Sequence, residues 1–355
     1  RHGTSPAPDV LDQYLPERGG VFPLSWKKVP LTNVHVSAAS ALVKKRYDPE
    51  FTVDGSCLLP LHPLAEKHHQ RASLVQSGSI SFSASYRTVF YTPEAGGPLH
   101  GFVEDDQALM LKLHLAEPLP GIAGDRRLTD SIIDRCVSVS SILQDALRNE
   151  EMASDLVIVP EEFGITDNDA GVLVRILPRR SLVPLFSVYS ADRSEPDEEP
   201  LIAELLRRRF GSNRDDAAEA LGDLFARPLI RSVVAGFRAG FSLEMHAQNT
   251  LVSLDDDKLI DKVWFRDIEG VLLFNDLRLQ RNLAPLLEDV DFLSELQPTI
   301  PASRYFNRNV DHDLGRVFAG VLRSLGACRF FNRNHCRLAE KAIRRVVRQA
   351  ISEGE

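Results

Sequence analysis

Residues 241–252 read Phe241-Ser242-Leu243-Glu244-Met245-His246-Ala247-Gln248-Asn249-Thr250-Leu251-Val252, and residues 264–270 read Trp264-Phe265-Arg266-Asp267-Ile268-Glu269-Gly270. In the first segment His246, Gln248 and Asn249 crowd into a turn between an expected helix and an expected strand. In the second, an Arg-Asp pair ends the next strand. Such a hairpin can bring an amide oxygen and a carboxylate to one hard cation, and Mg²⁺ needs few protein oxygens besides water and substrate phosphates. The two segments therefore predict a Mg²⁺ site that serves nucleotide-phosphate chemistry.

Each of these motifs has a plainer interpretation when it is taken alone. A His-x-x-Asn after a helix is more often a cap or turn device, and Arg-Asp-x-Glu is more often a solvated or ion-paired surface. Their succession between apolar strands favours a site. Kinase-like folds use the same logic, with a metal-binding Asn at the end of the catalytic loop and a metal-binding Asp on the next hairpin.

The N-terminal half supplies the cations that such a site needs. Residues 79–92 alternate small polar residues with aromatic or β-branched ones, which predicts a strand, and residues 109–115 form a second apolar strand that carries Lys112. If the two strands pair, Arg87 and Lys112 are neighbours and can hold a triphosphate. A lysine inside an apolar strand is costly unless it is paired or functional, and the alternative is a snorkelling edge-strand lysine.

Two further positions are candidates for binding an anionic substrate. His62, in Leu61-His62-Pro63, is either a substrate contact or a strand-end histidine bonded to backbone, and the composition favours the backbone role. Arg126 and Arg127 follow a Gly-containing loop, which suits an anion site, although two solvated arginines are an equal alternative.

The pattern along the chain predicts an α+β fold. Residues 1–30 indicate an irregular lead-in, and residues 130–148 have the period of an amphipathic helix. A polar break at residues 190–200 is the best candidate linker. We therefore expect a β-rich domain at residues 1–195 and an α-rich domain at residues 196–355, the latter with helices at 201–210, 217–241 and 314–351.

Composition narrows the class of protein. The 355 residues are 43% hydrophobic and 26% charged with a formal net charge of −8, which argues against a protein whose main partner is nucleic acid. Four dispersed cysteines without a CxxC pair make a disulfide framework or structural zinc site improbable. No apolar run is long enough to span a membrane and no signal peptide is evident, so we expect a cytoplasmic protein without a membrane partner.

The order of five motifs resembles the aerobactin synthetase (IucA/IucC-like) family of NRPS-independent siderophore synthetases. The resemblance spans roughly residues 57–280, and its motifs are Leu59-Pro60-Leu61-His62-Pro63, Ser85-x-Arg87-Thr88, Lys112-Leu113-x-Leu115, His246-x-Gln248-Asn249-Thr250 and Arg266-Asp267-x-Glu269-Gly270. The resemblance implies a multi-domain cupped-hand fold with fingers and palm and with distant kinase-like features. It also implies that ATP activates a carboxylic acid, typically citrate or a dicarboxylic acid, as an acyl-adenylate, which an amine or hydroxyl then attacks.

Site roles follow from the resemblance residue by residue. It implies that the ATP phosphates are held by Ser85, Arg87, Thr88, Lys112 and His246, of which Arg87, Lys112 and His246 act in catalysis. It implies Mg²⁺ binding by Asn249 and Asp267, with Glu269 beside them, and that His62 and either Arg126 or Arg127 receive the acid. A homodimer is common in similar proteins.

Three departures from the family pattern leave alternatives open. The family's Gly-His-Pro-x-His-Pro-type motif is missing from this chain, Leu64-Ala65 replaces an aromatic residue and a Gln, and residues 118–124 lengthen a loop. One alternative is a kinase-like phosphotransferase, because Glu244 precedes Asn249 by the offset of a kinase's catalytic Asp; the absence of a GxGxxG motif counts against it. Another is a shortened, non-catalytic homologue. The sequence does not identify the acid, the nucleophile or the oligomeric state.

Overall fold

The structure, a computed structural model, describes residues 19–36, 56–69, 73–83, 85–115, 127–148, 150–167, 170–178, 182–190, 199–255, 257–286 and 301–354. Two compact units emerge, unit 1 comprising residues 1–141 and 159–179, and unit 2 comprising residues 142–158 and 180–355. The units are interleaved along the chain, whereas the sequence analysis expected one boundary at residues 195 and 196. The assignment of fingers-like and palm-like regions stays a prediction.

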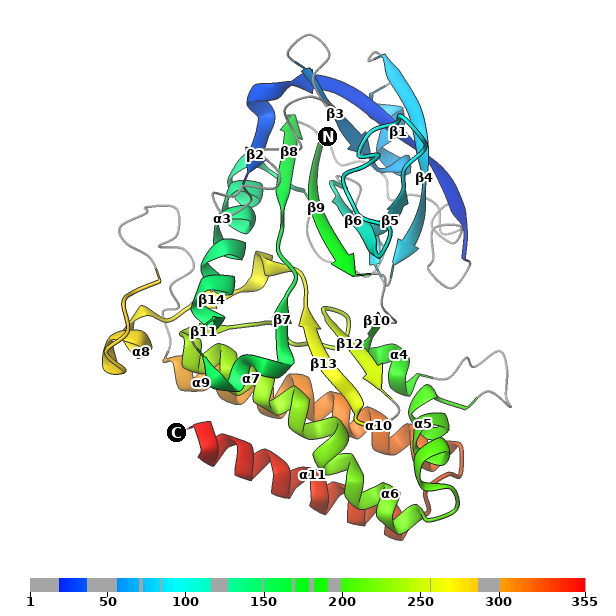
Figure 1. Ribbon diagram of the computed structural model, residues 1–355, viewed down its shortest axis with the longest axis vertical. Helices are drawn as coiled ribbons and strands as arrows, with labels where there is room; N and C mark the ends of the chain where they lie inside the picture. Colours follow the sequence, from blue (N-terminus) through cyan, green and yellow to red (C-terminus); the bar gives the residue numbers. More distant parts are fainter. Residues whose placement is uncertain are drawn as a thin grey trace. The chain divides into compact units, whose positions relative to one another are not determined.

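Unit 1 is built on an eight-stranded sheet in the order β2-β8-β9-β6-β5-β4-β1-β3, and every described strand pair in it is antiparallel (Figure 1). Its strands are β1 (Val21–Pro30), β2 (Val34–Val36), β3 (Ser56–Leu61), β4 (Leu74–Ser83), β5 (Ser85–Thr92), β6 (Gln107–Leu113), β8 (Phe163–Asp167) and β9 (Ala170–Pro178). Short 3₁₀ helices η2 (Leu31–Asn33) and η3 (Pro63–His68) follow β1 and β3. The single strand predicted at residues 79–92 is wrong, because residues 79–83 belong to β4, which pairs antiparallel with β5. The predicted pairing with residues 109–115 is confirmed for β5, which forms a hairpin with β6.

The two faces of this sheet pack differently. Leu109, Leu111 and Leu113 of β6 join the main apolar core on one face. Leu173 of β9 packs on the other face against Ile133 and other residues of α3 (Asp130–Leu147), the helix predicted at 130–148. Because side chains alternate along a strand, Lys112 lies on the α3 side of the sheet, level with its β9 partner Leu173.

The irregular lead-in predicted for residues 1–30 is wrong for its last ten residues. Val21–Pro30 form β1, which pairs with β4 on one side and β3 on the other, and Leu24 and Trp26 are buried in the core. Pro23 hid this strand from the sequence pattern, since proline cannot donate to a ladder. It is tolerated because the β1–β4 register shifts between Pro23 and Ser25.

Unit 2 combines a four-stranded sheet, in the order β10-β12-β13-β7, with a two-stranded sheet of β11 and β14. The strands are β7 (Leu156–Ile158), β10 (Leu182–Pro184), β11 (Phe241–Ser242), β12 (Thr250–Asp255), β13 (Leu259–Phe265) and β14 (Leu272–Leu273). The helices are η4 (Glu151–Asp155), α4 (Leu185–Tyr189), α5 (Leu201–Phe210), α6 (Arg214–Leu221), η5 (Gly222–Ala226), α7 (Arg227–Ala239), η6 (Ile268–Gly270), α8 (Asn275–Gln280), α9 (Ala302–Asn307), η8 (Arg308–Leu314), α10 (Gly315–Ala327) and α11 (Arg333–Gly354). Figure 1 shows α7, α10 and α11 below the β12–β13 hairpin.

Helix ends in unit 2 refine the sequence predictions. The helix predicted at 217–241 corresponds to α6, the π turn η5 and α7, which follow one another without a break. The helical stretch ends because Gly240 adopts φ 94°, a left-handed conformation that suits glycine. Phe241 therefore begins β11. The helix predicted at 314–351 is two helices, α10 and α11. No described helix is long and apolar enough to cross a membrane.

Candidate functional site

His246 and Asn249 close the turn that precedes β12. The His246 carbonyl accepts hydrogen bonds from the backbone N–H groups of Asn249 and Thr250, both at 3.1 Å. The Asn249 amide nitrogen also lies 3.1 Å from Nε2 of His246. Asn249 is buried and His246 is half-buried. Because the side-chain nitrogen of Asn249 is engaged by the imidazole, the side-chain oxygen of Asn249 is the atom left to bind a cation.

The register of the β12–β13 hairpin brings Asp267 to the same corner of unit 2. Thr250 pairs with Phe265, and the backbone N–H of Arg266 donates to the Asn249 carbonyl at 3.1 Å. Asp267 then takes a left-handed conformation (φ 75°, ψ 73°), which Asp and Asn tolerate better than most residues. This conformation turns the chain out of β13 into η6 and holds the carboxylate at the turn.

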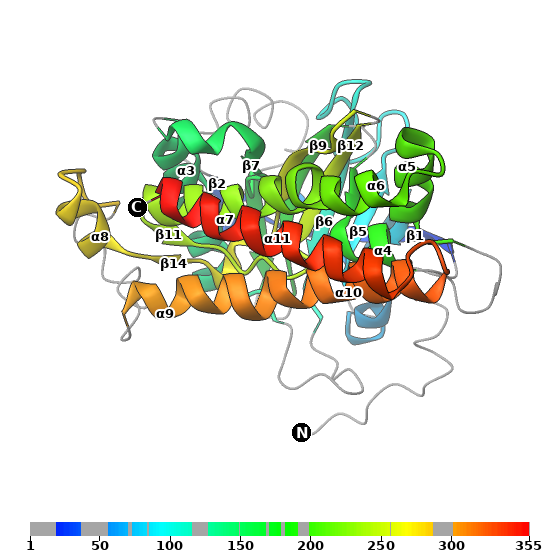
Figure 2. The same ribbon diagram turned by 90° about the horizontal axis from the view of Figure 1, so that it is seen from below.

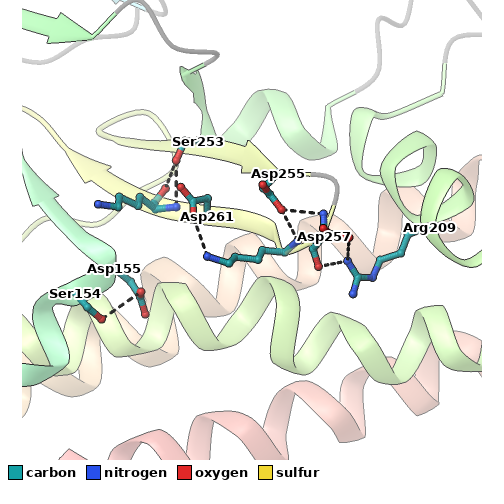
Figure 3. Close-up of polar contacts among 9 residues, drawn as sticks. Ser154, Asp155, Arg209, Ser253, Asp255, Asp257 and Asp261 are labelled. Atoms are coloured by element: carbon teal, nitrogen blue, oxygen red, sulfur yellow. Dashed lines mark hydrogen bonds and ion pairs between the residues drawn. The ribbon is translucent and has the colours of Figure 1, made fainter.

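Figure 3 shows the other end of this hairpin, where its two strands are tied together. Asp255 Oδ1 accepts from the backbone N–H groups of Asp257 (2.8 Å) and Lys258 (3.0 Å), and Lys258 Nζ lies 3.1 Å from Asp261. Ser253 Oγ accepts from Lys262 N–H at 3.1 Å. These bonds fix the loop and the register, and the register sets where Asn249 and Asp267 lie.

Arg266, which received no site role in the sequence analysis, supports this corner, and Glu244, the acidic residue of the kinase-like alternative, lies against it. The buried Arg266 guanidinium donates to the Gln248 carbonyl at 3.2 Å, so it braces the turn that carries Asn249. A Cβ atom on Gly270 would lie 2.5 Å from Glu244 Oε2, which shows that the Glu244 carboxylate rests against the η6 turn. The Arg-Asp and Asp-x-Glu-Gly patterns were visible in the sequence, but not which backbone atoms they meet.

The oxygen donors of this corner fit Mg²⁺. An amide oxygen and a carboxylate suit a hard cation that takes its remaining ligands from water and phosphate. Among the described residues, no group of three or more His, Cys, Asp and Glu side chains gathers as a metal site, which a two-ligand Mg²⁺ site does not need. Glu269 is half-buried in η6, and its place among the ligands stays a prediction.

In unit 1, Thr88 and Lys112 face each other across the β5–β6 hairpin, and both side chains are buried, Lys112 to 1% exposure. The β4–β5 register shifts between Phe82 and Ser83, so β5 carries extra residues over Ser85–Thr88. Such bulges re-aim side chains next to active sites. Ser85 Oγ accepts from the Arg87 backbone N–H at 3.4 Å, within this irregular stretch. That Ser85, Arg87, Thr88 and Lys112 hold phosphates stays a prediction.

His62 is bonded to backbone, as the composition suggested. Its Nε2 lies 2.7 Å from the Tyr86 carbonyl and its Nδ1 accepts from Leu64 N–H at 3.1 Å. Burial lowers the His62 pKa to about 4, the bond to Tyr86 opposing that shift. Since both ring nitrogens are engaged, the structure leaves neither for a substrate carboxylate. His62 therefore anchors the strand that carries Ser85-x-Arg87-Thr88.

The arginine candidates divide between described and undescribed residues. Arg127 is exposed at the start of its segment, and Arg126 lies outside the described residues. A pair that the sequence analysis missed is Arg175 and Glu161, both completely buried, with Nε–Oε2 2.7 Å and Nη2–Oε1 2.6 Å. The Glu161 backbone N–H donates to Ser140 Oγ at 2.9 Å. No sequence period signalled this pair, because its members lie in two separate segments.

The described candidates thus form two groups. Ser85, Arg87, Thr88 and Lys112 belong to unit 1, whereas His246, Asn249, Asp267 and Glu269 belong to unit 2. Each group is built by the packing of its own unit. A single phosphate site shared by both groups stays a prediction.

The fold defined by these two units is that of the siderophore synthetases. Over 99% of this chain it matches the structure of aerobactin synthetase IucA from a hypervirulent pathotype of Klebsiella pneumoniae, with a TM-score of 0.70 at 18% identity. The ATP-bound form of IucA matches over 98% of the chain (TM-score 0.67, 19% identity). The petrobactin biosynthesis protein AsbB from Bacillus anthracis str. Sterne matches over 96% (TM-score 0.68, 13% identity). The α+β prediction and the predicted resemblance are confirmed at the level of the fold.

The sequence comparisons cover less of the chain than the structural ones do. The family described as ferric iron reductase FhuF-like transporter matches residues 221–353, which lie in unit 2. The uncharacterized protein y4xN of Sinorhizobium fredii (strain NBRC 101917 / NGR234) is 24% identical over 293 residues, which are 76% of this chain. The chain spans 42% of the length of y4xN, 66% of the matched IucA chain, 65% of its ATP-bound form and 63% of AsbB.

Proposed function

We propose that this chain is an ATP- and Mg²⁺-dependent carboxylate ligase of siderophore biosynthesis. The observation that carries the proposal is the His246–Asn249–Asp267 corner, in which the imidazole orients the Asn249 amide. The likeness of the fold to an ATP-bound aerobactin synthetase supports ATP as the nucleotide. We place the reaction in the cytoplasm, where ATP is available, with small carboxylic acid and amine or alcohol substrates and without nucleic acid. Homodimer formation belongs to the same proposal.

The proposed reaction has two steps. An oxygen of the acid's carboxylate attacks the α-phosphorus of ATP, the bond from that phosphorus to the β-bridging oxygen breaks, and pyrophosphate leaves. The nitrogen or oxygen of the second substrate then attacks the acyl carbon, the acyl–phosphate bond breaks, and AMP leaves. The attacking group gives its proton to solvent or to a base, and we assign no described residue as that base. The products are an amide or ester, AMP and pyrophosphate.

In this proposal, the cationic residues would bind the phosphates and the residues with oxygen donors would bind Mg²⁺. The cations Arg87 and Lys112, with the hydroxyls of Ser85 and Thr88, would bind the phosphates, and charges placed in advance stabilise negative charge that develops on the leaving pyrophosphate. Asn249 and Asp267 would hold Mg²⁺, which when bound neutralises phosphate charge. His246 would orient Asn249 and donate to a phosphate oxygen. Arg126 or Arg127 would receive the acid.

A kinase-like phosphotransferase is the second candidate, and one observation favours it. The Glu244 carboxylate lies against the η6 turn that follows Asp267, close to where a phosphotransferase needs an acidic side chain. The nucleotide product separates the two functions, because adenylation releases AMP and pyrophosphate whereas phosphotransfer releases ADP.

The test measures pyrophosphate, AMP and ADP with citrate, 2-oxoglutarate and succinyl-type acids, each combined with polyamines and hydroxamate amines. We expect pyrophosphate release that requires both ATP and Mg²⁺ and that is abolished by Lys112→Ala. Lys28→Ala is the matched control, because Lys28 is an exposed strand lysine of the same sheet. ADP as the nucleotide product would establish phosphotransfer instead. Nucleotide binding without turnover for every pair would indicate a non-catalytic homologue.

A further inference from the structure

The C-terminal helices of unit 2 carry a concentration of positive charge that the proposed ligase reaction does not use. Residues 301–355 hold eleven Lys and Arg against five Asp and Glu, a net charge of +6 in a protein whose total is −8. All eleven basic side chains are exposed. The rest of the chain therefore carries −14, so the two signs are separated along the sequence.

On α11 the basic residues form one stripe. At about 100° per residue, the six exposed basic side chains fall within an arc of about 120° around the helix axis. They are Arg333, Arg337, Lys341, Arg344, Arg345 and Arg348. From Arg333 to Arg348 the stripe is about 22 Å long at ~1.5 Å per residue. We call it the basic ridge.

The opposite face of α11 is already occupied. Ala339, Ala342, Ile343 and Val346 are buried, and α11 packs on α6, η5 and α7. The helix therefore cannot turn its buried apolar face toward a partner, and cations outnumber the two exposed glutamates, Glu340 and Glu353, on its described exposed surface. Among the described residues, only Arg344 of the basic ridge has an ion pair, at 2.9 Å from Glu340 on the same helix.

A second row of cations runs beside the basic ridge. Figure 2 shows α10 beside α11, and these two helices are in contact; α9, η8 and α10 follow one another along the chain and form the neighbouring rod. This neighbouring rod exposes Arg304, Arg308, Arg316 and Arg323. Exposed cations therefore lie on two helices that are in contact, α10 and α11, and on α9 and η8, which precede α10.

The residue types exposed on these C-terminal helices indicate which class of partner they can bind. Protein interfaces have cores depleted in charge and enriched in apolar residues, yet none of the described residues of 301–354 is an exposed large hydrophobic. Groove recognition of nucleic acid is disfavoured, because a pair of neighbouring helices is too broad for a groove. An anionic bilayer surface requires only clustered cations, each of which adds to the attraction.

We propose that the basic ridge on α11, with the arginines of α9, η8 and α10, docks this protein on an anionic phospholipid surface by charge alone. No segment inserts into the bilayer. This proposal differs from the expectation of no membrane partner, which rested on the absence of a membrane-spanning segment. The inference does not depend on the ligase activity, so each can fail without the other.

The test is co-sedimentation of the purified chain with vesicles of phosphatidylcholine alone or mixed with phosphatidylglycerol. We expect binding only to the anionic vesicles, with a steep loss as salt rises, because screening weakens exposed charges. The triple variant Arg337→Glu, Lys341→Glu, Arg348→Glu should bind at least about a hundredfold more weakly. Circular dichroism and the unfolding temperature should stay unchanged, since these side chains are exposed.

The matched control reverses the same number of charges on other surfaces of unit 2. Arg148→Glu, Arg208→Glu and Lys258→Glu change exposed residues outside α9–α11 and should retain most of the vesicle binding. Equal loss in both triple variants would show that net charge, and not the basic ridge, governs binding. Equal binding to uncharged vesicles, no binding at low salt, or displacement from vesicles by duplex DNA at matched phosphate concentration would each overturn the proposal.

Discussion

The side-chain amide nitrogen of Asn249 lies 3.1 Å from Nε2 of His246, within a turn that the His246 carbonyl closes. The two residues therefore have different roles, since His246 orients Asn249. Because the Asn249 side-chain nitrogen is held by the imidazole ring, the side-chain oxygen of Asn249 is the atom left for another partner. Under the proposed function, His246 would orient a Mg²⁺ ligand, and that role would be the same for a reaction that releases AMP and for one that releases ADP.

Replacing Asp267 tests the metal site without disturbing the turn. Asp267→Asn keeps the shape and tolerates the left-handed conformation, so we expect an unchanged unfolding temperature and loss of pyrophosphate release. Asp267→Ala should lose the same activity and also about 1 kcal/mol of stability, because alanine is strained at this φ. Thermal unfolding and pyrophosphate assays separate the two effects. Full turnover by Asp267→Asn would remove Asp267 from the site.

Arg266 is expected to act through its neighbours. Arg266→Met removes the guanidinium donor to the Gln248 carbonyl while the backbone bond to Asn249 can remain. Residues that orient metal ligands typically change metal affinity by about 10–100-fold. We therefore expect the Mg²⁺ concentration for half-maximal activity to rise about tenfold or more, with little change in the KM of the acid. A proportional loss of kcat at saturating Mg²⁺, with unchanged Mg²⁺ dependence, would contradict this role.

His62 gives the protein a pH-dependent stability. Its folded pKa is about 4, below the ordinary 6.5, because burial disfavours the imidazolium. Between these values the unfolded chain binds more protons, so the stability from neutral His62 is complete above pH 6.5 and is lost as the pH falls through about 4. The steepest loss is about 1.4 kcal/mol per pH unit.

The measurement is the free energy of unfolding between these two pH values for the wild type and for His62→Asn, which cannot titrate. We expect the variant to be less stable at neutral pH and to lose less stability on acidification. Parallel curves would show that other groups govern the acid transition. Activity is a separate readout, since no ring nitrogen of His62 is left for a substrate.

The sequence predicted elements where one period dominates. The β5–β6 hairpin, α3 and α5 show a clear alternation or helical period, and the structure contains all three. It could not reveal β1, because Pro23 and two lysines interrupt the alternation, and that strand is stabilised by partners on both sides. Long-range pairing, which no local window contains, decided that element.

The same limit applies to the candidate site. Asn249 and Asp267 could be proposed from residue types, since oxygen donors and a hairpin are visible in the sequence. The bond from Arg266 to the Gln248 carbonyl, the contact of Glu244 with Gly270 and the left-handed turn at Asp267 depend on the register of β12 and β13. A slip of one residue would reverse every side chain, and the sequence does not state that register.

Removing either Glu161 or Arg175 alone should destabilise the fold, whereas replacing both with apolar residues should restore most of the stability. Both side chains are fully buried, and the guanidinium engages both carboxylate oxygens, at 2.7 and 2.6 Å. Removing one partner leaves an uncompensated charge, so Arg175→Met or Glu161→Leu alone should cost about 3–5 kcal/mol. The double variant should recover most of this loss, because two apolar side chains replace two desolvated charges. A double-mutant cycle in urea checks it, and additive losses would show that the two charges do not compensate each other.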